Sequence, residues 1–425
     1  MGVINGNLPD GWTWTTIGNV ADTTSGGTPL RSHPEYYGGN IPWLKSGELR
    51  DGIIRDAEET ITDAGLKNSS AKYFSKDTVV VALYGATVGR TGILGFDATT
   101  NQAICGISPR NNSFFSKYMF YWLQSQRQNL VNQSAGGAQP NISQGIIRNL
   151  PFPLSPLPEQ KRIVAKIEEL FTQLEAGTAA LKRVRAGLKR HKASVLKAAV
   201  EGRLLPVGGD EGRMQNDGDL PDGWRWTTIG ELAQHLTSGS RGWASYYSDE
   251  GSLFVRVGNF NRLSKTIDLN KKQFVNAPQT AEANRTRLKK RDLLITMTAD
   301  VGMVGIVDVN TLRWGDAYIN QHVGLVRLKD SDFVEYVAYA LASEYGQKQF
   351  REKQYGLTKV GLNFDDIRSL KIPLPPLAEQ RRIVAEVERR LSVAQEVESV
   401  VAASVARAGR LRQSVLKSAF EGRFK

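Results

Sequence analysis

The sequence predicts two mixed α/β globular parts that alternate with two long helices, in an internal duplication. The run PLPEQKRIVAKIEEL, which begins at Pro156, returns as PLAEQRRIVAEVERRL over 376–391, and both helical segments end alike, in SVLKAAVEGR and SVLKSAFEGR. The opening LPDGWTWTTIG at 8–18 recurs as LPDGWRWTTIG at 220–230. Self-similarity of this kind decides the architecture, so it is considered before any single element.

The first long helix is predicted from the spacing of its apolar and small residues. Steps of three and four alternate along it, which is the spacing of a coiled-coil seam. The seam residues are Ile163, Ile167, Leu170, Leu174, Gly177, Leu181, Val184, Leu188, Val195 and Ala198, with His191 interrupting as a packed helix residue. A helix over 158–203 would be roughly 65 to 70 Å long at 1.5 Å per residue.

The second long helix shows the same spacing less regularly. Its predicted seam consists of Ile383, Val387, Val397, Val401, Leu411 and Val415, while Arg390 and Ser404 fall on the same line. We therefore expect two long helices that pack on each other. The alternative is a pair of ordinary core helices, each buried in its own globular part.

The offsets between repeats define the predicted domains. The globular openings repeat at 212 residues and the helices at 220, which indicates a net insertion in the second globular part. The predicted boundaries are 1–155 and 220–375 for the globular parts, 156–205 and 376–425 for the helices, and 206–219 for a polar, Gly-rich linker.

Each globular part is predicted to be mixed α/β from short β-rich runs, Gly-rich turns and one longer helical stretch. The predicted strands are Thr78–Leu83, Gly92–Phe96, Leu253–Val257, Leu293–Met297 and Gly305–Val309, and the predicted helices are Phe115–Asn129 and Phe333–Phe350. Weaker internal matches pair WLKSGEL with FVRVGNF, Asn101-Gln102 with Asn320-Gln321, and Ile147-Arg148 with Ile367-Arg368. The scaffold repeats while the loops diverge, as expected of two modules that bind different targets.

Composition narrows the class of protein. The 425 residues are 40% hydrophobic, enough for several cores, and the net charge of +12 favours a polyanionic partner. Cys105 is the only cysteine, which excludes an intrachain disulfide, and the four histidines have no metal-ligand spacing. No segment has the apolar length of a membrane span, and the N-terminus lacks a signal-peptide core. We expect a cytoplasmic protein without a membrane partner.

Catalytic motifs are absent from the sequence. The nearest match to a phosphate-binding loop, GATVGRT at 85–91, is one residue short and is predicted to be a β-turn, as is its repeat partner TADVGMV. The E-x-K form at Glu159–Lys161 opens a helix and not a strand. The sequence also lacks an Asn-Pro-Pro-aromatic loop and a Gly-rich turn that would seat S-adenosylmethionine. We expect no catalytic residue, cofactor or metal on this chain.

These motifs resemble the DNA specificity subunit of type I restriction-modification enzymes. The resemblance is carried by the two LPxGWxWxxIG openings, the GGTP turn at 26–29, both Asn-Gln dipeptides, and the PLPEQKRIV and PLAEQRRIV helix starts. It spans essentially the whole chain. One departure is that TSGSRGWASYY stands at 237–247 in place of a second GGTP turn, so loop correspondences differ there.

The resemblance implies a fold and a set of partners. Each globular part would be a target recognition domain that reads one half-site of a bipartite double-stranded DNA target. The two helices would pack antiparallel as a ruler, with pseudo-twofold symmetry. Two methyltransferase subunits using S-adenosylmethionine and two ATP- and Mg-dependent translocase-nuclease subunits would complete the complex.

Loop side chains that can hydrogen-bond to bases or neutralise phosphates are the candidate DNA contacts. They are Arg31, Lys45, Tyr84, Arg90 and Asn141 in the first part, and Arg241, Arg256, Asn259, Arg262, Lys359 and Asn363 in the second. For each, the alternative is a solvated surface residue. Trp12, Trp14, Trp224 and Trp226 are predicted to be core anchors, because their motif repeats unchanged. A coiled-coil adaptor and a self-contained DNA-modifying enzyme remain open as other classes of protein.

Overall fold

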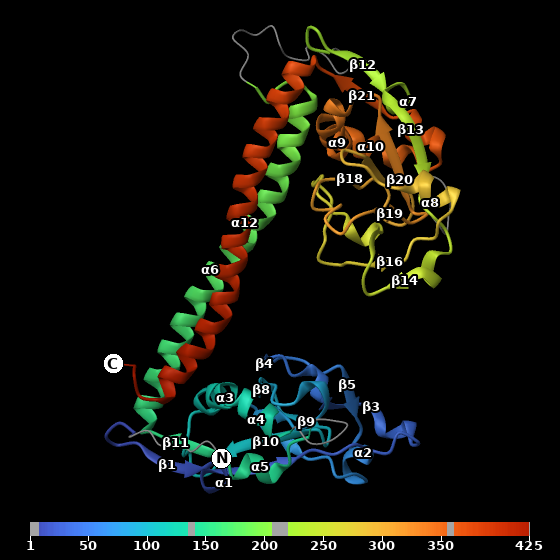
Figure 1. Cartoon of the computed structure of the whole chain (residues 1–425). Coiled ribbons are helices and arrows are strands. Elements are labelled where there is room, and N and C mark those ends of the chain that lie inside the picture. Colours follow the sequence, from blue (N-terminus) through green and yellow to red (C-terminus); the bar gives the residue numbers. More distant parts are fainter. Residues whose placement is uncertain (1–7, 135–140, 206–219, 355–360, 425) are drawn as a thin grey trace. The chain divides into compact units, whose positions relative to one another are not determined.

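The computed structural model describes residues 8–134, 141–205, 220–354 and 361–424 (Figure 1). The chain divides into two compact units, which we call the first unit (1–181 with 403–425) and the second unit (182–402). Each unit contains one globular domain and parts of both long helices. The predicted linker at 206–219 lies outside the described residues.

The first globular domain is built on three sheets, with strand orders β1-β11, β2-β10-β7-β8-β4 and β5-β3-β9-β6. Its strands are β1 (Thr13–Thr16), β2 (Ala21–Ser25), β3 (Tyr37–Leu44), β4 (Gly52–Ile54), β5 (Glu59–Ile61), β6 (Tyr73–Phe74), β7 (Val79–Ala82), β8 (Thr91–Leu94), β9 (Ala98–Thr100), β10 (Ile104–Pro109) and β11 (Pro151–Leu154). Its helices are α1 (Ile17–Val20), α2 (Asp63–Lys67), α3 (Ser116–Ser125), α4 (Arg127–Gln133) and α5 (Gln144–Arg148), with 3-10 turns η1 (Pro34–Tyr36), η2 (Ser46–Glu48) and η3 (Gly85–Thr87).

The second globular domain has matching sheets, with strand orders β12-β21, β13-β20-β17-β18 and β14-β16-β15-β19. Its strands are β12 (Arg225–Thr228), β13 (Ala233–Ser238), β14 (Tyr247–Ser248), β15 (Ser252–Val255), β16 (Phe274–Val275), β17 (Leu293–Thr296), β18 (Val304–Ile306), β19 (Ala317–Ile319), β20 (Val323–Leu328) and β21 (Lys371–Leu374). Its helices are α7 (Ile229–Leu232), α8 (Ala281–Thr286), α9 (Val334–Ala342), α10 (Glu344–Lys353) and α11 (Phe364–Arg368), with 3-10 turns η5 (Trp243–Tyr246), η6 (Val257–Asn259) and η7 (Ser331–Phe333).

Both domains open and close in the same way, and this explains the repeated opening motif. In each, the first strand pairs antiparallel with the strand that precedes a long helix. The motif then ends in a glycine whose added Cβ would lie 3.2 Å from a backbone oxygen: Gly18 against Arg148, and Gly230 against Arg368. Only glycine fits this close approach without a shift of the neighbouring backbone.

Most of the predicted elements of the globular parts are present. The five predicted strands overlap β7, β8, β15, β17 and β18, although β18 ends at Ile306, before the predicted end at Val309. Each predicted helix is interrupted, however: α3 gives way to α4 at Gln126, and α9 to α10 at Ser343. Ser343 is extended, and its hydroxyl accepts a hydrogen bond from the Gly346 amide, so it caps a new helix.

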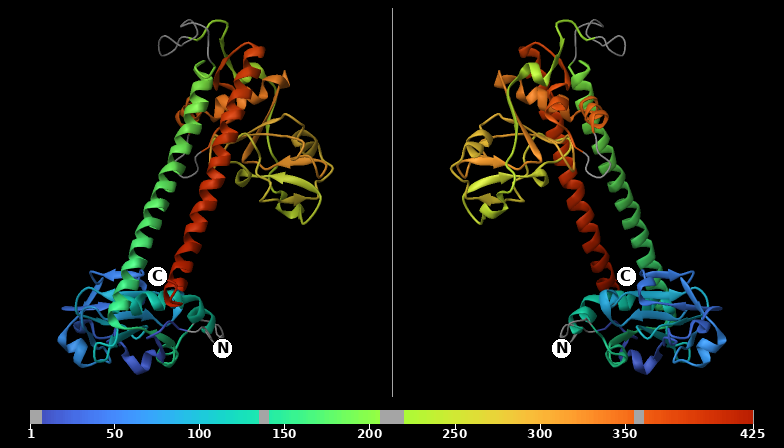
Figure 2. Two further views of the ribbon diagram at one scale, coloured as in Figure 1. Left: turned by 90° about the vertical axis from the view of Figure 1, so that its left-hand side faces the viewer. Right: turned by 90° about the vertical axis from the view of Figure 1, so that its right-hand side faces the viewer.

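The two long helices are α6 (Leu157–Val200) and α12 (Leu377–Phe420), 44 residues each. In the first unit, the start of α6 lies beside the end of α12 (Figures 1 and 2), and Arg412 Nη1 is 3.1 Å from Glu175 Oε1. In the second unit, the end of α6 meets the first half of α12, with Lys192 Nζ 2.6 Å from Glu398 Oε2. Arg162 also donates to the Phe424 carbonyl in the first unit, and Arg390 donates to the Leu204 carbonyl in the second. In each unit, residue numbers therefore fall along one helix as they rise along the other, so the two helices run antiparallel.

The predicted seam is correct toward the start of each long helix and at Val401, and it is wrong at Val184, Val397 and Leu411. Ile163, Ile167, Ile383 and Val387 are buried, as expected. Val397 and Leu411, in contrast, are 38% and 44% exposed, and Val184 is 45% exposed. The burial of α12 follows Leu391, Ala394, Glu398, Val401, Val405, Ala408 and Arg412. Small and charged residues interrupt the apolar residues of this line, so apolar spacing alone placed Val397 and Leu411 on the seam wrongly.

His191 is a further correction. It is exposed, and the neighbouring Lys192 lies on the helix pairing instead, through its contact with Glu398. The tryptophan prediction holds in part: Trp224 is buried and Trp12 and Trp14 are half-buried, but Trp226 is 40% exposed and packs against Tyr345. None of the helices among the described residues has an apolar stretch long enough to cross a membrane.

The repeated Glu-Gln of the helix starts has a packing role. Gln160 is fully buried, its Oε1 accepts from the Phe115 amide at 2.8 Å, and its Nε2 donates to the Ser155 carbonyl at 2.8 Å. Gln380 is also buried, and its Nε2 donates to the Pro375 carbonyl at 2.8 Å. In both copies, this glutamine fixes the first turn of the long helix to the strand that precedes it.

Candidate nucleic-acid interface

Two of the candidate cations in the first domain converge on one carboxylate. Arg31 Nη2 lies 2.8 Å from Glu59 Oε2, and Lys45 Nζ lies 2.9 Å from Glu59 Oε1. The arginine side chain is 55% exposed and the glutamate 31%. The two cations are among the candidates predicted from the sequence, whereas the anion between them is not.

Aromatic side chains hold this group in place. The Arg31 guanidinium carbon lies 4.2 Å from the ring centroid of Tyr37 and 5.2 Å from that of Trp43. Trp43 is buried, and its indole nitrogen donates to the Gly27 carbonyl at 2.9 Å. The hydrogen bond from the Lys45 ammonium lowers the pKa of Glu59, and the same bond raises the pKa of Lys45. The carboxylate is therefore held ionised.

The other three candidates of this domain lie around the hairpin that joins β7 and β8. Tyr84 forms an antiparallel bridge with Asn141, which precedes α5. Arg90 is exposed at the end of the hairpin loop, and among the described residues it makes no ion pair within 4.0 Å. Burial raises the pKa of the Tyr84 phenol, which keeps it a hydrogen-bond donor. The GATVGRT segment is a short 3-10 turn between antiparallel strands, whereas a phosphate-binding loop joins a strand to a helix.

The second domain repeats this frame with other side chains. Lys45 and Arg256 are equivalent, because each backbone amide donates to the side chain three residues later: to Glu48 at 2.7 Å and to Asn259 at 2.9 Å. The Arg256 guanidinium carbon lies 5.9 Å from the Tyr247 ring centroid. The bridge between Tyr84 and Asn141 corresponds to one between Thr298 and Gly361.

Asn259 is a correction to the candidate set. It is 2% exposed, and its Nδ2 donates to the carbonyls of Asp268 and Lys271 at 2.7 and 3.0 Å. With its Oδ1 bound to the Arg256 amide, both halves of the side-chain amide are engaged in holding the loop. The Asn259 side chain is therefore not available to hydrogen-bond to a base.

The remaining candidates of the second domain are dispersed. Arg241 is exposed beside β13, and Arg262 Nη1 donates to Gln347 Oε1 at 2.9 Å. Asn363 caps α11, where its Oδ1 accepts from the Asp366 amide at 2.9 Å, and its side chain stays exposed. Lys359 lies outside the described residues.

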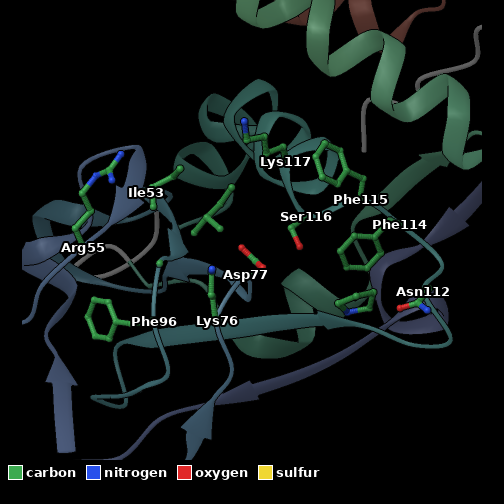
Figure 3. A pocket seen from close by; sticks show the side chains of 13 residues that line it. Ile53, Arg55, Lys76, Asp77, Phe96, Asn112, Phe114, Phe115, Ser116 and Lys117 are labelled. Carbon is green, nitrogen blue, oxygen red and sulfur yellow. The ribbon is translucent and has the colours of Figure 1, made fainter.

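A groove of about 720 Å³ lies beside β4 and α3 of the first domain (Figure 3). Its walls combine the cations of Arg55, Lys76 and Lys117 with the apolar side chains of Ile53 and Phe96. Cations at such an open edge have the chemistry of phosphate contacts. The sequence offered no signal for this groove, because its residues come from distant loops.

No group of three or more metal-ligating side chains comes together within residues 8–134, 141–205, 220–354 and 361–424. What both domains share is an exposed set of hydrogen-bonding and cationic side chains, carried on loops above a repeated frame. The family described as the type I restriction modification DNA specificity domain matches the chain twice, over residues 9–183 and 221–391. The chain belongs to this family.

Curated relatives of this specificity subunit agree over nearly its full length. The type I restriction enzyme EcoBI specificity subunit of Escherichia coli is 24% identical, covering 99% of this chain and 88% of the relative. The StySPI specificity subunit of Salmonella potsdam is 26% identical, covering 98% and 90%. Specificity subunits are the non-catalytic DNA-recognition subunits of their enzymes, so the adaptor and the self-contained enzyme are set aside.

Solved structures show the same fold. One, from work on complex assembly and conformational transition of the type I R-M system, has a TM-score of 0.73 and 22% identity, covering 97% of this chain and 98% of that one. The HsdS subunit from Thermoanaerobacter tengcongensis has a TM-score of 0.59 and 21% identity, covering 99% and 100%.

Proposed function

We propose that this specificity subunit binds a bipartite double-stranded DNA target, with one half-site read by each globular domain. The recognition domains are residues 1–155 and 220–375, and the spacer helices are residues 156–205 and 376–425. The protein would bind this DNA in the cytoplasm. The observation that carries the proposal is the repeated frame, in which equivalent loop positions hold different side chains.

The equivalent positions support two different half-sites. Lys45 corresponds to Arg256, and the Tyr84–Asn141 bridge corresponds to Thr298–Gly361. These positions are mostly part-exposed loop positions, and base recognition favours a difference between them, because each base pair presents a different donor and acceptor pattern in the major groove. The buried glutamines and close-approach glycines, which serve packing, are the same in both halves.

Ten of the original candidates remain proposed DNA contacts. They are Arg31, Lys45, Tyr84, Arg90, Asn141, Arg241, Arg256, Arg262, Lys359 and Asn363. Exposed cations such as Arg90 suit guanine edges or phosphates, and Asn141 and Asn363 suit adenine edges.

The helices and the other subunits complete the proposed complex. The antiparallel pairing in each unit suits a ruler that sets the unread spacer, and an internal duplication joined in this way suits pseudo-twofold symmetry. Two methyltransferase subunits would use S-adenosylmethionine to methylate adenine, and two translocase-nuclease subunits would use ATP and Mg. These cofactors would sit on the partners and not on this chain.

The test is to sequence methylated adenines in cells that express this chain with its methyltransferase subunits. We expect one bipartite motif: two short defined half-sites separated by an undefined spacer of fixed length. A single continuous motif, or methylation that stays unchanged when this chain is omitted, would contradict the proposal. The purified chain supplied with S-adenosylmethionine alone serves as the control and should transfer no methyl group.

A further inference from the structure

The strand pairing assigns a counterpart to Glu59 in the second domain. On β3 and β5, Trp43 stands opposite Glu59. On β15 and the segment that enters β16, the Phe254 amide donates to the Gln273 carbonyl at 2.8 Å, and Leu253 stands opposite Phe274. Because Trp43 and Phe254 are equivalent, Gln273 occupies the position of Glu59.

The frame around this position is preserved. Trp43 and Phe254 each pair with a parallel strand, β9 or β19, that is followed by an Asn-Gln dipeptide. A cation stands two residues after each aromatic residue, as Lys45 or Arg256. What changes is the side chain opposite: a carboxylate in the first domain and an amide in the second.

The Glu59 carboxylate is exposed and rigid at the same time. Its Oε1 accepts a hydrogen bond from Lys45 at 2.9 Å, its Oε2 forms an ion pair with Arg31 at 2.8 Å, and each oxygen has a second lone pair. Arg31 is itself stacked on Tyr37 and Trp43, so the carboxylate sits in a fixed orientation with 31% of its side chain open to solvent. A group ordered before binding loses little conformational entropy when it engages a ligand.

We propose that Glu59 and Gln273 are specificity-determining residues, each reading one base of its own half-site. A carboxylate only accepts hydrogen bonds, so Glu59 selects a base with an exocyclic amino group, cytosine or adenine, in the major groove. The Gln273 Nε2 donates one hydrogen to the Phe274 carbonyl at 3.1 Å, which leaves its second hydrogen and its oxygen for a base, so Gln273 selects adenine through N6 and N7. Arg31 and Lys45, which are also proposed DNA contacts, position the Glu59 carboxylate. This inference rests on the proposed function.

The test uses three variants of the full chain in complex with its methyltransferase subunits. Glu59→Gln removes the charge and supplies a donor. Gln273→Glu makes the reverse change in the second domain. Glu58→Gln is the matched control: it makes the same carboxylate-to-amide change on an adjacent side chain that is 60% exposed and whose closest cation contact is longer, at 3.4 Å. The readouts are the methylated motif in cells and binding to duplexes with single base substitutions at every motif position.

We expect Glu59→Gln to relax or change one position of the first half-site, with a loss of discrimination of roughly 5- to 150-fold there. The second half-site should be unchanged. Gln273→Glu should alter one position of the second half-site only, and Glu58→Gln should alter neither.

Each other outcome has a definite meaning. If the wild-type complex yields a bipartite motif and Glu59→Gln leaves discrimination at every position unchanged, Glu59 is not a reader, while the proposed function stands. If Glu59→Gln also abolishes discrimination in the second half-site, Glu59 is a structural residue and the inference is overturned. If the wild-type complex has no bipartite motif, the proposed function itself fails.

Discussion

Replacing Gln160 by methionine should destabilise the first unit much more than the equivalent change at Gln380 destabilises the second. Methionine keeps the length and approximate volume of glutamine and removes only the amide. The Gln160→Met variant leaves the Phe115 amide and the Ser155 carbonyl without their 2.8 Å partners. An unpaired buried polar group costs about 1 to 3 kcal/mol, so we expect a total loss of about 2 to 4 kcal/mol, because the Phe115 amide is only part-buried.

The Gln380→Met variant is the internal control. It removes one bond, to the Pro375 carbonyl, and it also removes the Gln380 Oε1 atom, which is buried and has no hydrogen-bond partner among the described residues. The two changes offset each other, so we expect a loss of about 1 kcal/mol or less. The start of α9 does not depend on Gln380, because the Asp330 side chain caps the preceding turn.

Thermal unfolding and hydrogen exchange measure the difference. For a unit of this size, each kcal/mol lowers the melting temperature by about 2 to 4 °C, so Gln160→Met should shift the first unit's transition by roughly 4 to 16 °C. Exchange should rise in the peptide over 113–118, which contains the Phe115 amide. Equal shifts for both variants, or unchanged exchange at that peptide, would refute the assigned role of the hydrogen bonds.

Three further outcomes are expected. Lys265→Ala should destabilise the second unit by about 1 kcal/mol, because the Lys265 ammonium lies 2.5 Å from Glu388 and the side chain is only 18% exposed. The melting temperature of the second unit should fall, and Lys265→Arg should restore part of it. An unchanged melting temperature would contradict this prediction. Four-residue insertions after Gly177 and Val397 should lengthen the distance between the recognition domains by about 6 Å. The unread spacer of the methylated motif should then grow by one or two base pairs, with both half-sites unchanged. An unchanged spacer would exclude the helices as the ruler. Exchange of residues 20–148 for those of a relative should change one half of the methylated motif, and a change in both halves would refute independent reading.

The internal duplication could be predicted from the sequence because packing repeats residue by residue. Gly18 and Gly230 recur because a Cβ would meet backbone at 3.2 Å, and Gln160 and Gln380 recur because each is buried at the same joint. The strands followed from local apolar runs for the same reason. Such constraints restrict the residue type at a position, so the repeated residues can be recognised in the sequence alone.

The pairing face of α12 could be predicted only in part: Val401 is buried as expected, but the burial line also runs through Ala394, Glu398 and Arg412, while Val397 and Leu411 are exposed. Hydrophobic spacing identifies the buried face only where apolar residues occupy it. Here two ion pairs and small side chains lie along the contact, and which partner each charge finds depends on the facing helix.

The candidate nucleic-acid interface was likewise predictable from the sequence only in part. Residue type alone identified Arg31, Lys45 and Arg256, since exposed cations in loops are apparent from the sequence. Only the tertiary structure showed that Asn259 is engaged inside its own loop, and that Glu59 lies between Arg31 and Lys45. The physical reason is that the sequence determines which groups a loop carries, while strand register and the packing of distant segments decide which of those groups meet and which remain free to contact DNA.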